Sequence, residues 1–381
     1  MSPFYDESFL NDTESEFFGT KLLGWLDGNR QDAVDLVNYF IDLGQLEEAG
    51  FWADRIEQTG LPKAYLANGI GLINTCPEES VQFLLAAFHG LHPGAVNPLY
   101  ELLISNTPAR LDLDPSIYKQ TREELRALLM QRQVSELPTV ILAGTRPVLF
   151  QKVPGPPTFD NAQWGGGSLF VVEWEGESFA VTALHVIENL GAERKEFRLL
   201  IPGTEATLEM YGGISPSSEI PSGDEVDDIY AWHIKGLRAN EEHLGWWSWK
   251  LNTWSKHASE LTPSQDLFVA GFPDIDERYD HENFKVVPLA SILSGQLSSD
   301  PAVEGLFVMD VEEVDHVMNL MSGGPVFARF DGLLHYVGMI VRGDSDARKI
   351  YFIDAKYIIE LLTRHNQEAH FSSPNMPDNT T

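Results

Sequence analysis

Thr182-Ala183-Leu184-His185 and Ser322-Gly323-Gly324-Pro325 are the two short stretches that decide the fold of this chain of 381 residues. A serine followed by two glycines can occupy a sharp turn that exposes its Oγ and backbone N–H, and a distant histidine can act as its base. Together the stretches indicate a serine nucleophile with an imidazole partner. Taken singly, each has a plainer interpretation, an ordinary Gly-Pro turn and a core histidine.

A candidate for the third catalytic group lies between these stretches, in residues 227–234 (DDIYAWHI). A buried carboxylate beside an imidazole fixes its tautomer and stabilises the imidazolium that forms when the serine loses its proton. We assign Asp228 rather than Asp227 to this role. The plainer alternative is an aspartate that marks the beginning of a strand.

The order His185, Asp228, Ser322, with gaps of 43 and 94 residues, resembles that of the chymotrypsin/trypsin-like serine peptidases and differs from the subtilisin and α/β-hydrolase orders. Three further segments resemble the family in the same order along the chain. They are residues 165–172 before the T-A-x-H segment, residues 267–273 at the opening of a second barrel, and residues 336–343 on the strand that pairs with substrate. The resemblance implies a two-barrel antiparallel β domain over residues 137–368 and a serine endopeptidase activity.

The same resemblance implies the surroundings of the nucleophile. The oxyanion hole would be formed by the backbone N–H groups of Leu320 and Ser322. The substrate-binding positions correspond to His316, Val341, Arg342 and Gly343. Because His316 and Arg342 can both be cationic, they predict a preference for an acidic substrate side chain. A loop histidine and a surface arginine are the alternative interpretation.

The chain departs from the family pattern at Leu320 and Met321, where many members have Gly and Asp. Glycine permits a peptide orientation that a Cβ opposes, and loss of one oxyanion donor costs about 2.7–4 kcal/mol of transition-state stabilisation. The alternatives to an active peptidase are a catalytically inactive fold used as a protein-binding module and an esterase of small acyl esters. Met321 also replaces the Asp that pairs with a new N-terminus in zymogen-activated relatives, so the resemblance is to bacterial-type members that need no such cut.

Residues 1–136 differ in kind from the remainder, because their apolar residues recur at helical spacing, as in Ala33, Leu36, Val37, Phe40 and Ile41. Residues 51–64 and 83–95 each read as an apolar helix stopped by Gly, a turn with Pro, and an Ala that opens the next helix. This pattern resembles Sel-like repeats of the tetratricopeptide superfamily, which implies stacked helix pairs with a concave surface for a protein partner. A helical domain packed on the peptidase is the alternative. Small residues are expected where helices approach: Ala64, Ala67, Ala86, Ala87 and Ala95.

The segment 137–163 contains five prolines and excludes a long helix, whereas residues 139–142 (TVIL) predict a first strand of the barrel. Residues 357–364 predict a closing helix, and residues 369–381 a disordered tail. Four tryptophans within residues 245–254 predict either burial in the seam between the barrels or an aromatic recognition surface.

The composition is that of an ordinary globular protein, with 43% hydrophobic and 22% charged residues, but the net charge is −31. Such a surface excludes nucleic acids and anionic membranes as favoured partners and suits a basic protein or a cationic segment. The single cysteine, Cys76, excludes an internal disulfide, and residues 1–10 lack the features of a signal peptide, so we expect a cytoplasmic protein. No metal motif occurs, and we expect no cofactor.

Overall fold

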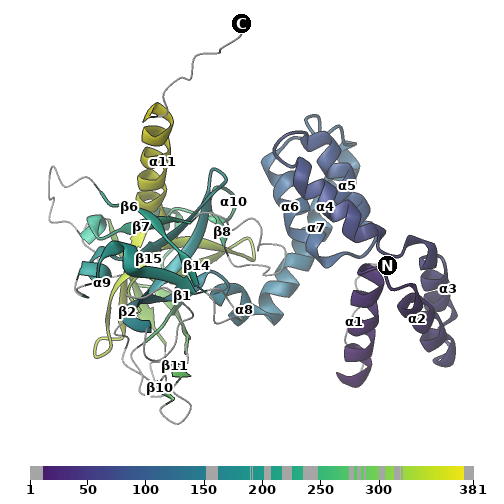
Figure 1. Cartoon of the computed structure of the whole chain (residues 1–381), viewed down its shortest axis with the longest axis horizontal. Helices are drawn as coiled ribbons and strands as arrows, with labels where there is room; N and C mark the ends of the chain where they lie inside the picture. Colours follow the sequence, from purple (N-terminus) through teal and green to yellow (C-terminus); the bar gives the residue numbers. More distant parts are fainter. Residues whose placement is uncertain are drawn as a thin grey trace, which may run out of the picture. The chain divides into compact units, whose positions relative to one another are not determined.

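The computed structural model describes residues 12–151, 162–188, 190, 192–200, 207–216, 225–234, 248–273, 279–280, 285–286, 289–299, 305–312, 318 and 321–372. The chain forms two compact units, Met1–Arg132 and Gln133–Thr381. The first unit is helical and the second consists mainly of antiparallel strands (Figure 1). In the described part of the chain, no helix is both long and apolar enough to cross a membrane.

The first unit contains a series of short helices, as the apolar spacing predicted. In α2, Ala33, Leu36 and Phe40 are buried, whereas Ile41 at the end of the same stripe is 50% exposed. The Asn29 side chain accepts a hydrogen bond from the Gln31 N–H and caps the beginning of α2. The helices are α1 (Asp12–Leu26), α2 (Arg30–Asp42), α3 (Leu46–Ala53), α4 (Leu61–Leu72), α5 (Pro77–His89), α6 (Val96–Ser105) and α7 (Pro115–Ser135), the last of which extends into the second unit.

The two segments predicted to repeat each other differ in local structure. Gly90 follows α5 and caps its end, as predicted. Helix α3 instead ends at Ala53, and Gly60, with a φ of +76°, lies directly before α4 and begins that helix. Glycine is common where the backbone adopts a left-handed conformation, and at Gly60 that conformation precedes a helix and does not end one. The prediction that glycine stops both helices is therefore wrong for the first segment.

The close approach of α4 to α5 also uses a residue other than those predicted. Ala64 and Ala67 are exposed on α4, whereas Gly69 is buried. A Cβ on Gly69 would lie 2.7 Å from the Leu84 side chain of α5. The absence of a side chain at Gly69 allows the two helices to pack closely at Leu84.

The second unit begins with a short helix where the sequence predicted a strand. Residues 139–142 lie in α8 (Leu137–Leu142), which has Pro138 in its first turn. Proline has a φ suited to a helix start, and burial of Val140 and Ile141 by packing overrides their strand preference. The first strand is β1 (Thr145–Gln151).

The first sheet is antiparallel apart from one short parallel strand, and it closes on itself. Its described path is β5-β4-β1-β2-β3-β7-β6, formed by β1, β2 (Ala162–Trp174), β3 (Glu177–Thr182), β4 (Phe197–Leu200), β5 (Thr207–Glu209), β6 (Tyr211–Ile214) and β7 (Tyr230–Ile234). The two edge strands, β5 and β6, are separated in sequence by Met210 alone. Residues 207–214 therefore act as one bent strand that joins β4 to β7 and completes a barrel. The parallel strand β8 (Trp249–Lys250) adds to β2.

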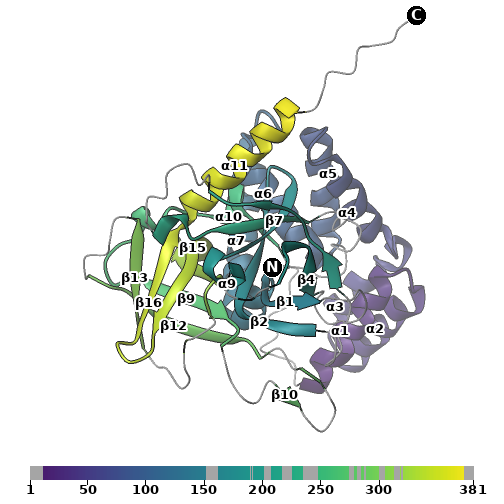
Figure 2. The ribbon, with the colours of Figure 1, turned by 60° about the vertical axis from the view of Figure 1, so that its left-hand side comes forward.

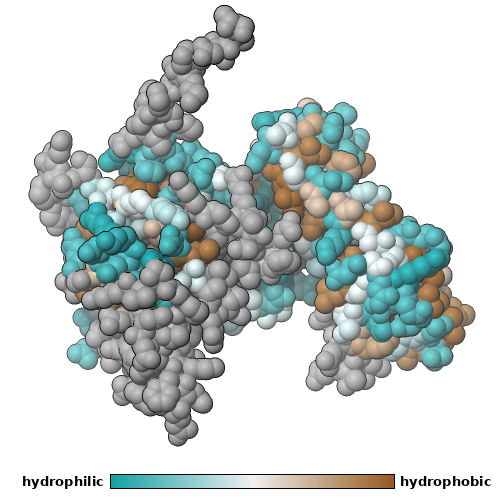
Figure 3. All heavy atoms as spheres, in the orientation of Figure 1, coloured by the Kyte–Doolittle hydropathy of each residue, from teal (hydrophilic) through white to brown (hydrophobic). Residues whose placement is uncertain are grey.

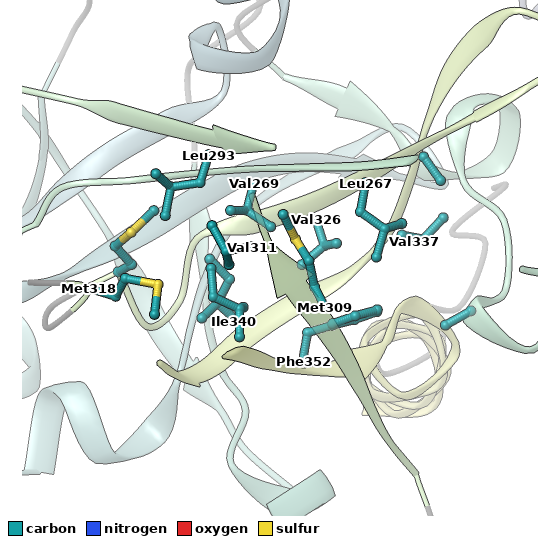
Figure 4. Close-up of a cluster of buried hydrophobic side chains, with 14 residues drawn as sticks. Leu267, Val269, Leu293, Met309, Val311, Met318, Val326, Val337, Ile340 and Phe352 are labelled. Carbon is teal, nitrogen blue, oxygen red and sulfur yellow. The ribbon is translucent and has the colours of Figure 1, made fainter. Parts of the chain in front are cut away.

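The second sheet is a closed barrel with the order β12-β13-β16-β15-β14-β9. It is formed by β9 (Asp266–Gly271), β12 (Ser291–Leu297), β13 (Leu306–Val311), β14 (Pro325–Phe330), β15 (Leu333–Asp344) and β16 (Lys349–Asp354), of which β9, β12, β13, β15 and β16 are labelled in Figure 2. A separate ladder joins β10 (Tyr279–Asp280) to β11 (Lys285–Val286). Its interior is filled by side chains that include Leu267, Val269, Met309 and Phe352 (Figure 4).

Both barrels have the same strand pairing. The six strands of each barrel can be numbered in chain order: β1, β2, β3, β4, β5 with β6 as one strand, and β7 in the first barrel, and β9, β12, β13, β14, β15 and β16 in the second. In both barrels the described strands then pair in the closed order 1-2-3-6-5-4-1. This repeated pairing confirms the predicted architecture, an N-terminal helical domain followed by a two-barrel antiparallel β domain of the trypsin-like class.

Aromatic side chains fill the seam between the barrels. Phe170 of β2 stacks on Tyr336 of β15 with ring centroids 5.2 Å apart, and Trp249 lies 4.6 Å from Phe327 of β14. Trp249 and Trp254 are both buried. For these two tryptophans the prediction of burial is confirmed and the alternative of a recognition surface is wrong, whereas Trp246 and Trp247 lie outside the described residues.

Helix α11 (Ala355–Ser372) follows the last strand and contains the predicted closing helix. It leaves the second barrel and reaches the first, where Asn366 donates a hydrogen bond of 3.1 Å to Glu175. The His365 ring lies 6.3 Å from that of Phe179. The helix continues past residue 369, so the predicted beginning of a disordered tail is wrong, and residues 373–381 lie outside the described part.

Candidate active site

His185 and Asp228 meet at one end of a pair of neighbouring strands. In the antiparallel pair β3 and β7, Thr182 lies opposite Tyr230. His185 follows Thr182 by three residues, in α9 (Leu184–Glu188), and Asp228 precedes Tyr230 by two, so both leave the strand pair at the same end. The strand register thus brings together two residues that are 43 positions apart.

The Asp228 carboxylate contacts His185 through both of its oxygens. Oδ2 lies 2.6 Å from Nδ1 of the imidazole, and Oδ1 accepts a hydrogen bond of 2.9 Å from the His185 backbone N–H. This second bond fixes the carboxylate relative to the backbone of the histidine as well as to its ring. The contact with Nδ1 orients the ring so that Nε2 is the nitrogen that can take a proton from a nucleophile.

The hydrogen bond that His185 donates to Asp228 raises the pKa of His185 above its ordinary value of 6.5, and partial burial opposes this shift. A carboxylate partner favours the charged imidazolium, whereas removal from water disfavours it. The arrangement therefore makes His185 a stronger base than a free histidine. The same partner would stabilise the imidazolium formed during proton transfer.

Ser322 lies in a tight turn that is clamped to β15. The Gly323 N–H donates to the Ile340 carbonyl over 2.8 Å, and the Ile340 N–H donates to the Gly324 carbonyl over 2.8 Å. Gly323 has a φ of +86°, which favours glycine. The Ser322 Oγ donates a hydrogen bond of 2.9 Å to the Val341 carbonyl. The turn thus holds the serine half-buried against β15.

The preceding residue, Met321, is anchored in the apolar interior of the second barrel. It is 1% exposed and belongs to the buried cluster that also contains Met318, Leu293 and Ile340. Burial of a methionine side chain contributes about 1.5–3 kcal/mol of transfer free energy. Packing of Met321 inside the second barrel therefore helps to hold the serine turn in place.

The serine turn also contacts the first barrel through Ser168 of β2. The Ser168 N–H donates to the Ser322 carbonyl over 2.8 Å, and the Thr182 hydroxyl donates to the Ser168 carbonyl over 2.6 Å. A Cβ on Gly323 would lie 2.0 Å from the Ser168 carbonyl oxygen and 2.3 Å from the Thr182 Oγ1. The segment that carries the nucleophile and the segment that carries His185 thus meet at one residue of β2.

The predicted substrate-binding residues Val341, Arg342 and Gly343 follow Ile340 on β15. The Arg342 guanidinium lies 4.2 Å above the ring of Tyr351. A Cβ on Gly343 would lie 2.9 Å from that of Met318, so the strand passes close to the segment before the serine. His316 and Leu320 lie outside the described residues.

Ser168 and Thr182 are the site residues for which the sequence suggested no role. Thr182 belongs to the T-A-L-H motif, and Ser168 follows three consecutive glycines, which often mark a close approach of backbone. Their connection to Ser322 is a long-range contact, and neither motif alone reveals it. In the described residues, no group of three or more His, Cys, Asp or Glu side chains could hold a metal ion.

Comparisons with known proteins give little further information. No protein-family model matches the chain, and no curated protein matches it. Among solved structures, the chain is similar to a thermostable serine protease, AL20, from an extremophilic microorganism, with 12% identity and a TM-score of 0.39. The match covers 59% of this chain and 97% of that one. A likeness this low decides neither fold nor activity, so the assignment of the second unit to the trypsin-like class depends on its two identically paired barrels.

Proposed function

We propose that this protein is a serine endopeptidase in which Ser322 is the nucleophile, His185 the general base and acid, and Asp228 the residue that orients His185. The proposal depends chiefly on the two-oxygen contact of Asp228 with His185, and on Ser168, which bonds both to the Ser322 turn and to Thr182, three residues before His185. Such a carboxylate and imidazole pair beside a serine turn is the arrangement required for acyl transfer.

In the proposed reaction, the Ser322 hydroxyl turns from the Val341 carbonyl towards Nε2 of His185 and gives up its proton as Oγ attacks the peptide carbonyl. The tetrahedral intermediate collapses to an acyl-enzyme when His185 donates that proton to the leaving amine. Water, deprotonated by His185, then attacks the acyl carbon; the bond to Oγ breaks, the acid product leaves, and the proton passes from His185 back to Ser322. The backbone N–H groups of Ser322 and Leu320 would stabilise the negative oxygen.

The substrate would extend along residues 341–343 of β15. Ile340 makes the backbone-to-backbone hydrogen bonds between this strand and the serine turn, and the strand continues beyond it to Asp344. An extended peptide could add there by backbone pairing, with its scissile carbonyl near Ser322. Arg342, together with His316, would favour an acidic residue in the substrate. Cleavage of a peptide library only after arginine or leucine would contradict that preference.

The helical unit would recruit a protein partner or substrate, and we retain the Sel-like class of repeat as part of this proposal. It exposes apolar side chains among polar ones, including Leu46 at 71% and Ile70 at 49% (Figure 3). Acidic residues such as Glu47 and Glu48 lie beside Leu46, which suits a partner segment that combines basic and apolar residues. The proposal includes a cytoplasmic location, for which the single cysteine is the supporting observation.

A fluorophosphonate probe, which reacts covalently with an activated serine, tests the catalytic proposal. The wild-type protein should be labelled once, at Ser322, and Ser322→Ala should abolish labelling without a change in thermal unfolding. Labelling that persists in Ser322→Ala would refute the assignment of the nucleophile.

A catalytically inactive domain that only binds protein is the second candidate, and Leu320 and Met321 favour it. Absence of labelling in the folded wild-type protein would support this candidate over both enzymatic ones. If labelling occurs, comparison of a peptide library with short acyl esters distinguishes a peptidase from an esterase.

A further inference from the structure

We infer that Ser168 and Thr182 are positioning residues that set the location of Ser322 relative to His185. The inference rests on the proposed function of Ser322 and His185. It concerns two residues that touch neither substrate nor the transferred proton, and whose effect on the reaction is exerted through the serine turn.

Ser168 is bonded to three separate parts of the site. Its N–H donates to the Ser322 carbonyl over 2.8 Å, and its carbonyl accepts the Thr182 hydroxyl over 2.6 Å. Its own Oγ accepts a hydrogen bond of 2.9 Å from the Phe272 N–H, just after β9 of the second barrel. One residue of the first barrel is therefore connected to the nucleophile turn, to the strand that leads to His185 and to the second barrel.

Thr182 is the donor that strand pairing does not supply to Ser168. The pairing of β2 with β3 begins at Phe170 and Val181, so Ser168 lies just outside that ladder, and its carbonyl faces the β3 side of β2, away from β1. The Thr182 hydroxyl reaches the Ser168 carbonyl from the neighbouring strand β3 instead. Because Thr182 lies only three residues before His185, this bond connects the backbone of the base to the residue that holds the nucleophile.

Both residues are completely buried, so water cannot replace these bonds. The serine turn lies directly against them, since a Cβ at Gly323 would be 2.0 Å from the Ser168 carbonyl oxygen. Removal of the Thr182 hydroxyl would leave that carbonyl without the donor and allow Ser168 and the attached turn to shift. A displacement of the nucleophile by a fraction of an ångström is sufficient to slow acyl transfer.

The test compares Thr182→Val, which keeps the shape of the side chain, with the conservative variant Thr182→Ser. Thr145→Val is the matched control, because the buried Thr145 hydroxyl also donates to a backbone carbonyl, that of Ile141, in the same unit. The measurements are the rate of fluorophosphonate labelling as a function of pH, and the midpoint of thermal unfolding. We expect Thr182→Val to lower the limiting rate about 10- to 100-fold with an unchanged pH midpoint. Thr182→Ser should restore the rate, and Thr145→Val should lower the unfolding midpoint without slowing labelling.

Equal labelling rates for Thr182→Val and the wild-type protein would overturn the inference, as would an equal loss of rate in Thr145→Val. If Thr182→Val does not fold, Ser168→Ala tests the other positioning residue, because it removes the acceptor for the Phe272 N–H and keeps the backbone bond to Ser322; labelling of this variant at the wild-type rate would overturn the inference.

Hydrogen exchange tests the inference even if the wild-type protein is not labelled, an outcome that would count against the proposed function alone. The Gly323 amide, which donates to Ile340, should exchange faster in Thr182→Val than in the wild-type protein or Thr145→Val. Unchanged protection of this amide would overturn the positioning role.

Discussion

Gly323→Ala should displace the serine turn, because the new methyl group would collide with two atoms of the first barrel. The Cβ would lie 2.0 Å from the Ser168 carbonyl oxygen and 2.3 Å from the Thr182 Oγ1. Both atoms belong to residues that are completely buried and already hydrogen-bonded to each other. Neither can therefore move away without the loss of that bond.

Two contributions determine the expected loss of stability. Gly323 has a φ of +86°, and a residue with a Cβ in the left-handed region costs about 1–2 kcal/mol. Overpacking of a closely packed site costs about 1–3 kcal/mol more. We therefore expect the free energy of unfolding of the second unit to fall by about 2–5 kcal/mol.

Gly212→Ala is the control that separates the two contributions. Gly212 also has a positive φ, +58°, but a Cβ there would have nothing within 4 Å. It should lose only the backbone contribution of about 1–2 kcal/mol. Urea unfolding of both variants, followed by the signal of the buried tryptophans, gives the comparison.

The labelling rate supplies the second measurement for the same pair of variants. Displacement of the turn by about 1 Å should slow reaction of Ser322 with a fluorophosphonate about 100-fold in Gly323→Ala. Gly212→Ala should react at the wild-type rate. If the two variants lose the same stability and label equally fast, the turn does not lie against Ser168, and this reasoning is wrong.

Three other predictions concern the base, the anchor of the turn and the seam. The labelling rate should rise with pH through a midpoint above 6.5, and Asp228→Asn should lower both rate and midpoint, because Asp228 raises the pKa of His185. Because the pKa of His185 is raised in the folded protein, its bond to Asp228 stabilises the fold fully below pH 6.5, and this stabilisation is lost as pH rises through the folded pKa. The difference in thermal unfolding midpoint between the wild-type protein and Asp228→Asn should therefore become smaller as pH rises. Met321→Asp should lower the free energy of unfolding by about 3–5 kcal/mol, the cost of an uncompensated buried charge, whereas Met321→Leu should change urea unfolding little. Trp249→Ala should cost about 3–5 kcal/mol in the same measurement, and a loss below 1 kcal/mol would contradict its burial against Phe327.

The sequence predicted those parts of the fold that are signalled by short motifs or by regular spacing. The apolar spacing of α2 predicted a helix, and the segments around Gly271 and Gly338 predicted strands that are observed as β9 and β15. Of the two neighbouring aspartates, the predicted Asp228 is the one that contacts His185 in the structure. The local sequence was sufficient to find this contact because Asp228 and His185 lie at the neighbouring ends of β7 and β3.

The remaining features depend on contacts between distant residues. The β-branched run 139–142 forms a helix because its tertiary packing outweighs its local strand preference. Gly60 begins a helix rather than ending one, which its flanking sequence does not distinguish. The bonds of Ser168 join residues 14, 104 and 154 positions away, and no periodicity along the chain encodes such pairings.

The bent segment 207–214 covers two sheet edges of the first barrel, which matters if the chain is cut within it. A sheet edge offers unpaired N–H and C=O groups that recruit strands from other molecules. In the first barrel, this segment occupies the free sides of both β4 and β7. A single cut on either side of Met210 would remove the covalent link between β5 and β6 and leave each held to its neighbour by its own short ladder, so the cover on both edges depends on this one crossing of the chain.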